Sequence, residues 1–159
     1  MAKQNTFFIL LFGLCVANAF SQSQNVALPN ATALCNRVAE IKQLPFKNES
    51  GVDAAYDALI EAGEAIVPCL IDKVSDTKVM LDPRCPHVTD ETRVGDVAYF
   101  VLVDIIKIGF VELFPADVHK NFKTDGVYAY HEYIDRKGKH KLLQSKLREW
   151  YRQKQNAKT

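Results

Sequence analysis

The sequence predicts an all-α protein, with about six helices packed as stacked antiparallel hairpins in one compact domain. Apolar residues recur at helical spacing in successive segments, and no segment shows convincing period-two alternation. Gly63, Gly109 and Gly138 fall between these segments, where helices usually end. After removal of a targeting segment, about 140 residues would remain, which suits one domain.

The helices are expected in chain order, each limited by a cap or a breaker. Ser50, Thr92 and Thr124 are expected N-caps, and Pro45 ends the first helix. The tight junction at Gly63 should make the second and third helices antiparallel neighbours. We expect helices over residues 33–44, 51–62, 64–74, 93–108, 125–134 and 139–154, with a further short one after Pro115.

Residues 93–108 form the most apolar of these segments and should be the central helix. Asp96 and Asp104 lie two turns apart on it. Paired carboxylates can perform acid–base chemistry, but a carboxylate among valines and phenylalanines needs a partner. We therefore expect Asp96 to pair with Arg93 or to cap a neighbouring backbone.

The first residues read as a targeting segment. Lys3 precedes an apolar run at 7–16, and Ala17-Asn18-Ala19 is a small-x-small cleavage site. We expect a cleaved signal peptide at residues 1–19, a disordered segment at 20–30 and the helical domain at 31–155. No later segment has the length of a transmembrane helix, so the sequence predicts a periplasmic or secreted protein.

Three cysteines would remain after cleavage: Cys35, Cys69 and Cys85. Export makes a disulfide plausible. We predict Cys35–Cys69, because both lie near the apolar faces of expected helices. The alternative, Cys69–Cys85, would tether the loop at 76–92. Either closure is worth about 3 kcal/mol in the chain-entropy model.

Charge is divided unevenly along the chain. Residues 136–158 carry a net charge of +8, and residues 20–135 carry −8. One interpretation is a solvated helix whose cations favour its dipole. The other is a basic face for an acidic protein or an anionic surface. The candidate binding residues of this helix are Arg136, Lys139, Lys141 and Arg148.

The long loop at 76–92 supplies the other candidate binding residues, Asp82, Arg84 and His87. Asp82, Cys85 and His87 have the residue types of half a metal site, but no second ligand pair at recognised spacing accompanies them. The chain also lacks catalytic and nucleotide-binding motifs. We expect no metal and no cofactor.

One stretch resembles a known family. Gly63-Glu64-Ala65-Ile66-Val67-Pro68-Cys69-Leu70-Ile71, followed by Asp76, resembles the core of HEAT-like repeats, and Arg93-Val94-Gly95-Asp96-Val97-Ala98 resembles the next packing helix. In layout the chain is similar to small, signal-peptide-bearing bacterial HEAT-like proteins of unassigned function. The resemblance implies a helical fold and transfers no catalytic residue. Only about one and a half repeats are legible, which favours a compact relative over an open solenoid.

These observations predict an exported module that binds another protein and carries no chemistry, such as a periplasmic inhibitor or immunity-type protein. A first alternative is a cell-envelope hydrolase that uses Asp96 or Asp104. A second is an envelope structural protein that docks on anionic surfaces through residues 136–158. We expect no nucleic acid partner, because export takes the protein away from nucleic acid.

Overall fold

The computed structural model describes residues 31–45, 51–84 and 91–158, and within them it confirms the all-α fold class. The predicted signal peptide and the segment 20–30 lie outside this part of the chain. In order, the elements are α1 (Ala31–Asn36), the 3-10 helix η1 (Arg37–Glu40), α2 (Ala54–Ala62), the 3-10 helix η2 (Gly63–Ile66), α3 (Val67–Lys73), β1 (Val79–Met80), β2 (Thr92–Arg93), α4 (Val94–Ile106), α5 (Ala116–Asp125), α6 (Val127–Ile134) and α7 (Lys139–Asn156).

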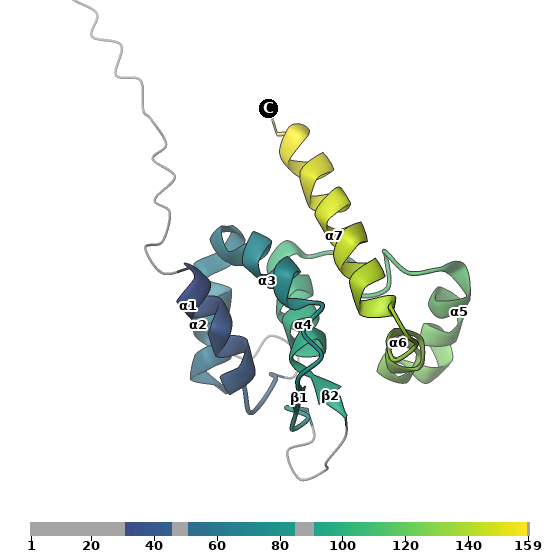
Figure 1. Ribbon diagram of the computed structural model, residues 1–159, viewed down its shortest axis with the longest axis horizontal. Coiled ribbons are helices and arrows are strands. Elements are labelled where there is room, and N and C mark those ends of the chain that lie inside the picture. Colours follow the sequence, from purple (N-terminus) through teal and green to yellow (C-terminus); the bar gives the residue numbers. More distant parts are fainter. Residues whose placement is uncertain (1–30, 46–50, 85–90, 159) are drawn as a thin grey trace, which may run out of the picture.

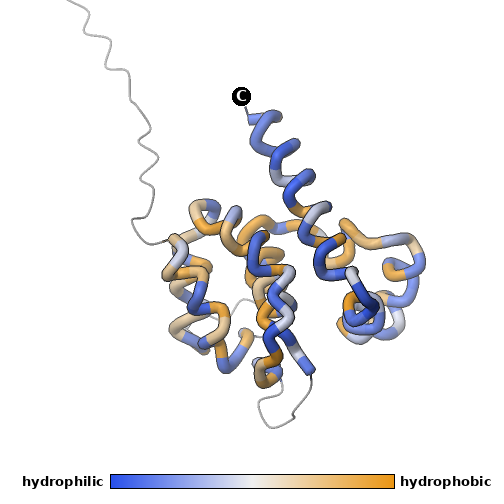
Figure 2. Tube along the Cα trace, viewed as in Figure 1, coloured by the Kyte–Doolittle hydropathy of each residue, from blue (hydrophilic) through white to orange (hydrophobic). Residues whose placement is uncertain are grey.

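The helices form two groups that α7 connects (Figure 1). In the first group, α4 packs against α3, α2 and η1. In the second, α5 packs against α6. Helix α7 contacts both α3 and α6, and its C-terminal half projects beyond the other helices. This outer half is mostly hydrophilic (Figure 2), as expected of a helix that buries only a narrow stripe.

Helix α4 is central, as its composition predicts. Its residues from Val94 to Leu102 are all buried. Tyr99 stacks on Tyr130 of α6, with ring centroids 5.5 Å apart. Phe110 and Phe114, which follow α4, also lie against Tyr130. This aromatic cluster joins the two helix groups, because its members come from both.

Three predicted caps are wrong. The N-cap of α4 is Arg93, not Thr92, which lies in strand β2. The cap of α2 is Asp53, not Ser50, and its carboxylate accepts the N–H groups of Ala55 and Tyr56 at 2.8 and 3.0 Å. Thr124 lies within α5, where its hydroxyl donates to the Asn121 carbonyl. Gly126 separates α5 from α6 instead, because its φ of 58° is a conformation that glycine adopts without a steric penalty.

The segment expected as an irregular loop contains a small antiparallel sheet. Val79 pairs with Arg93 and Met80 with Thr92. Strands of two residues are too short to show alternation in sequence. Gly95 allows the close approach behind this sheet: its N–H donates to the Asp76 carbonyl at 2.9 Å, and a Cβ there would lie 2.9 Å from that oxygen.

The predicted disulfide between Cys35 and Cys69 is present and links α1 to α3 across a Cα–Cα distance of 6.3 Å. Its sequence separation of 34 residues corresponds to about 3–4 kcal/mol in the chain-entropy model. Cys85, the partner in the alternative pairing, lies outside the described residues. None of the helices in the described ranges combines the length and apolarity needed to cross a bilayer.

Candidate functional site

The insertion between α3 and α4 forms a hairpin arm, which we define as the described residues Val79–Arg84 and Glu91–Arg93. Val79 and Leu81 have 56% and 60% of their surface exposed, whereas Met80 between them is half-buried. Side chains two residues apart in an extended segment point to the same side. The arm therefore presents two neighbouring apolar side chains to solvent.

Asp82 and Arg84 fix the first side of the arm, Val79–Arg84. The Asp82 carboxylate is 2% exposed and accepts the backbone N–H of Arg84 at 2.8 Å and its Nε–H at 2.9 Å. A third hydrogen bond, from Nη2 of Arg84, measures 2.5 Å. Burial alone would raise the pKa of Asp82, but hydrogen bonds from Arg84 and Thr92 outweigh it and lower the pKa to about 2. Asp82 is therefore ionised at neutral pH.

Arg84 also joins the arm to the helical body. Its Nη2 lies 3.0 Å from Nε2 of His131 on α6, and its guanidinium lies 5.1 Å from the centre of the Phe100 ring on α4. Burial, and then the positive charge of Arg84, lower the pKa of His131. Because arginine only donates, neutral His131 is the acceptor of this hydrogen bond. The adjacent Pro83 carbonyl accepts the N–H of Leu44 at 3.1 Å.

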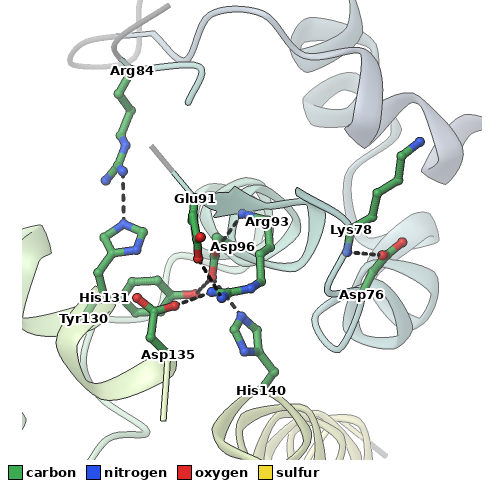
Figure 3. Close-up of polar contacts among 10 residues, drawn as sticks. All are labelled: Asp76, Lys78, Arg84, Glu91, Arg93, Asp96, Tyr130, His131, Asp135 and His140. Carbon is green, nitrogen blue, oxygen red and sulfur yellow. Dashed lines mark hydrogen bonds and ion pairs between the residues drawn. The ribbon is translucent and has the colours of Figure 1, made fainter. Parts of the chain in front are cut away.

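The second side of the arm, Glu91–Arg93, ends in a set of polar contacts with the helices (Figure 3). The Arg93 guanidinium pairs with Asp135 at the end of α6, and the Arg93 N–H donates to Oδ2 of Asp96 at 2.8 Å. Oδ1 of Asp96 accepts the Tyr130 hydroxyl at 2.8 Å and lies 3.0 Å from Nε2 of His140 on α7. This arrangement ties the arm to α4, α6 and α7.

Asp96 is fully buried, with 0% of its surface exposed. Burial acts to raise its pKa, but hydrogen bonds from His140, the Arg93 backbone and Tyr130 prevail and lower it. The predicted backbone cap is confirmed, since Asp96 accepts the Arg93 N–H. We call the set that holds both sides of the arm the anchor network. Its members are Asp82, Arg84, Arg93, Asp96, Tyr130, His131, Asp135 and His140, and Figure 3 shows all of them except Asp82.

The candidate residues of the basic segment lie elsewhere in the fold, in the turn before α7 and along α7. Arg136 pairs with Glu132, and the Lys139 ammonium lies 4.9 Å from the centre of the Tyr133 ring. Arg148 pairs with Asp72 at 2.6 Å. Lys141 is exposed. Several of these cations therefore help to seat α7 against α6 and α3. His87 lies outside the described residues.

Sequence reasoning missed the two histidines of the anchor network. The sequence predicts a satisfied core or half-buried histidine at His131 but does not identify its partner, and His140 is one of the histidines that are scattered singly. The single available signal was Asp96 itself, because a carboxylate on an apolar helix requires donors. That signal does not say which distant residues provide them.

The site combines exposed apolar side chains on the arm with the charged residues that hold it. Among the described residues, no group of three or more His, Cys, Asp or Glu side chains is arranged to hold a metal ion. The fold and the site together define an all-α protein with an anchored hairpin arm. Comparison of the chain with protein-family models, with curated proteins and with solved structures found no match.

Proposed function

We propose that this protein is an exported, non-catalytic module of the inhibitor or immunity type, which binds another protein through its arm. The observation that carries the proposal is the exposure of Val79 and Leu81 on an arm whose two sides are each fixed by an ion pair. A surface that is ordered before binding loses less conformational entropy when the partner arrives. Burial of apolar side chains then supplies binding free energy.

A surface hollow beside the arm also supports a protein partner. A hollow of about 740 Å³ lies between the arm and the N-terminal helices. Met80, Leu81, Ile41 and Ala55 provide apolar lining, and Arg37, Glu40, Lys42 and Asp53 provide charged groups. An apolar centre with polar groups at its margin is the usual composition of a protein interface.

The hydrolase alternative has less support. Asp96 is fully buried and occupied by three hydrogen bonds, so a substrate cannot reach it without rearrangement. Asp104 is eight residues further along α4, which is about 12 Å along a helix axis. The carboxylate pairs of glycosidases lie closer, at about 5–9.5 Å. Asp104 instead accepts the Tyr56 hydroxyl at 3.0 Å.

Export rests on the pattern at residues 1–19 and on the Cys35–Cys69 disulfide, because disulfides persist in oxidising compartments. Docking of α7 on an anionic surface is the weaker binding alternative. Arg148 and Lys139 are engaged within the molecule, which leaves fewer cations for an external surface.

The proposal is tested by capture from an envelope extract with the chain from residue 20 onward as bait, followed by cross-linking and mass spectrometry. Val79→Asp/Leu81→Asp disrupts the apolar pair on the arm. Leu142→Asp is the matched control, because Leu142 is an exposed apolar residue of α7. We expect a specific partner with the unmodified bait and with Leu142→Asp, and its loss with the double variant.

Two results would contradict this function. One is failure to recover any specific partner even after cross-linking. The other is equal recovery by the double variant, provided that its circular dichroism and unfolding midpoint match those of the unmodified protein.

A further inference from the structure

A second, smaller pocket lies beside Arg84, and the proposed function does not use it. Its volume is about 210 Å³. Its walls are mainly apolar, with two charged groups among them. The lining residues are Leu44, Pro45, Phe100, Phe110, Val127, Arg84 and Asp104.

The two charges of this pocket differ in how far they are neutralised. Asp82 balances the Arg84 guanidinium through the hydrogen bonds from Nε and Nη2 described above. Asp104 accepts a hydrogen bond from the neutral hydroxyl of Tyr56, and within the described part of the chain it forms no ion pair with a cation. Burial, and then the charge of Asp104, raise the pKa of Tyr56, so the phenol stays neutral. The pocket therefore has an excess negative charge at Asp104.

The size of the pocket restricts its occupant. Sites for small molecules and cofactors usually start at about 300 Å³, whereas a cavity of about 150 Å³ holds a benzene ring. A pocket between these sizes fits one large side chain. A long basic side chain matches both properties, since its aliphatic stem packs on apolar walls while its charged end reaches a polar group.

The charge of the whole body agrees with this occupant. Residues 20–135, which include every residue of the pocket, carry a net charge of −8. Complementary charge speeds association and selects against partners of the same sign. The basic residues of this chain are concentrated after residue 135, away in sequence from the pocket.

We propose that the pocket receives a lysine or arginine side chain of the protein partner. The stem lies against Leu44, Phe110 and Val127, and the charged end pairs with Asp104. This inference rests on the proposed function and adds the kind of residue that the partner presents beside the arm. Arg84 belongs both to the arm and to the pocket wall, so one partner surface contacts the two together.

The test uses the chain from residue 20 onward and three probes: the N-acetyl N-methylamides of lysine, arginine and norleucine. Norleucine has an aliphatic chain like that of lysine without the ammonium. Backbone amide shifts of Phe100, Asp104 and Val127 are followed by NMR during titration. We expect saturable, weak binding of at least one basic probe and at least tenfold weaker binding of norleucine.

Variants locate the charge that matters. Asp104→Asn keeps an acceptor for Tyr56 but removes the charge. It should weaken binding of the basic probe at least tenfold. Asp117→Asn, an exposed acid of α5, is the matched control and should leave binding unchanged. Added NaCl should weaken binding, because salt screens the pairing.

The inference is overturned by equal binding of norleucine, by unchanged affinity in Asp104→Asn, or by the absence of saturable shifts. These failures are separable from failure of the proposed function. Partner capture depends on Val79 and Leu81, and it can succeed even if the pocket takes no basic side chain.

Discussion

The anchor network and the outer half of α7 use the same chemistry in opposite surroundings. Both contain arginine–carboxylate pairs. In the network, the side chains of Arg84 and its partner Asp82 are 24% and 3% exposed. On α7, the side chains of Arg148 and its partner Asp72 are 55% and 66% exposed. Burial, and not the number of ion pairs, therefore separates contacts that fix a structure from contacts that water and salt weaken.

This difference bears on function, because a binding surface is most effective when it is already ordered. The arm gains that order from contacts to three helices. The outer half of α7 has i,i+3 contacts such as Arg152–Glu149, which are local and exposed. Four substitutions test the contrast, beginning with the largest expected effect.

Asp96→Ala should cause the largest loss of stability. It leaves the Tyr130 hydroxyl, His140 and the Arg93 N–H without their shared acceptor in a buried site. Loss of one member of such a buried set typically costs about 3–5 kcal/mol. Urea denaturation measures this change in unfolding free energy. Asp96→Asn, which keeps acceptor capacity, should cost less; equal stability of Asp96→Ala and the unmodified protein would refute the role of the network.

Asp82→Asn should remove a pH-dependent contribution. The Asp82 pKa falls from an ordinary 3.8 to about 2 on folding, which corresponds to about 2 kcal/mol of stability. Because the folded-state pKa is the lower one, this stability is present above pH 3.8 and disappears as the pH falls towards 2. Denaturation curves at several pH values should show that the variant has a lower unfolding free energy than the unmodified protein at pH 6. The difference in unfolding free energy should shrink by pH 2. A constant difference would contradict the assignment.

His131→Gln should produce a smaller pH effect, which has the same direction but falls in a higher pH range. Burial and Arg84 lower the folded-state pKa of His131, so the folded protein binds this proton less readily than the unfolded chain. Stability in the unmodified protein should therefore fall as the pH drops below about 6.5. Glutamine keeps an acceptor for Arg84 and does not titrate. Its stability profile between pH 7 and 5 should be flatter than that of the unmodified protein, and an identical slope would exclude His131 as the cause.

Arg148→Ala should have the smallest effect. Its pair with Asp72 is exposed, and such pairs contribute about 0–1 kcal/mol. Thermal unfolding should give this variant an unfolding free energy within about 0.5 kcal/mol of that of the unmodified protein. A loss comparable to that of Asp82→Asn would break the contrast between the two regions.

The parts of the fold that the sequence predicts are those governed by local patterns. The apolar stripe of residues 93–108 predicts a central helix, and α4 is central. Facing apolar positions predict the Cys35–Cys69 pairing, which is present. Both depend on periodicity within a helix.

The anchor network is not accessible to such reasoning. Arg84 contacts His131, which is 47 residues away in sequence, and Asp96 contacts His140, which is 44 residues away. No local pattern encodes either contact. The strands β1 and β2 escape prediction because pairing over two residues depends on the helices at each end. Asp82 and Arg84 were predicted as binding residues from their place in a long loop; the structure gives them contacts that order the arm.

The central claim is that the arm is held in one conformation before any partner binds. Native-state hydrogen exchange tests it at the amides of Arg84 and Val94, which donate to Asp82 and to the Lys78 carbonyl. We predict that the protection factors of these two amides lie within about tenfold of those in the middle of α4, because the two amides become exposed only when the core opens. Exchange of the Arg84 and Val94 amides at the rate of an unstructured peptide, while the middle of α4 remains protected, would contradict the claim.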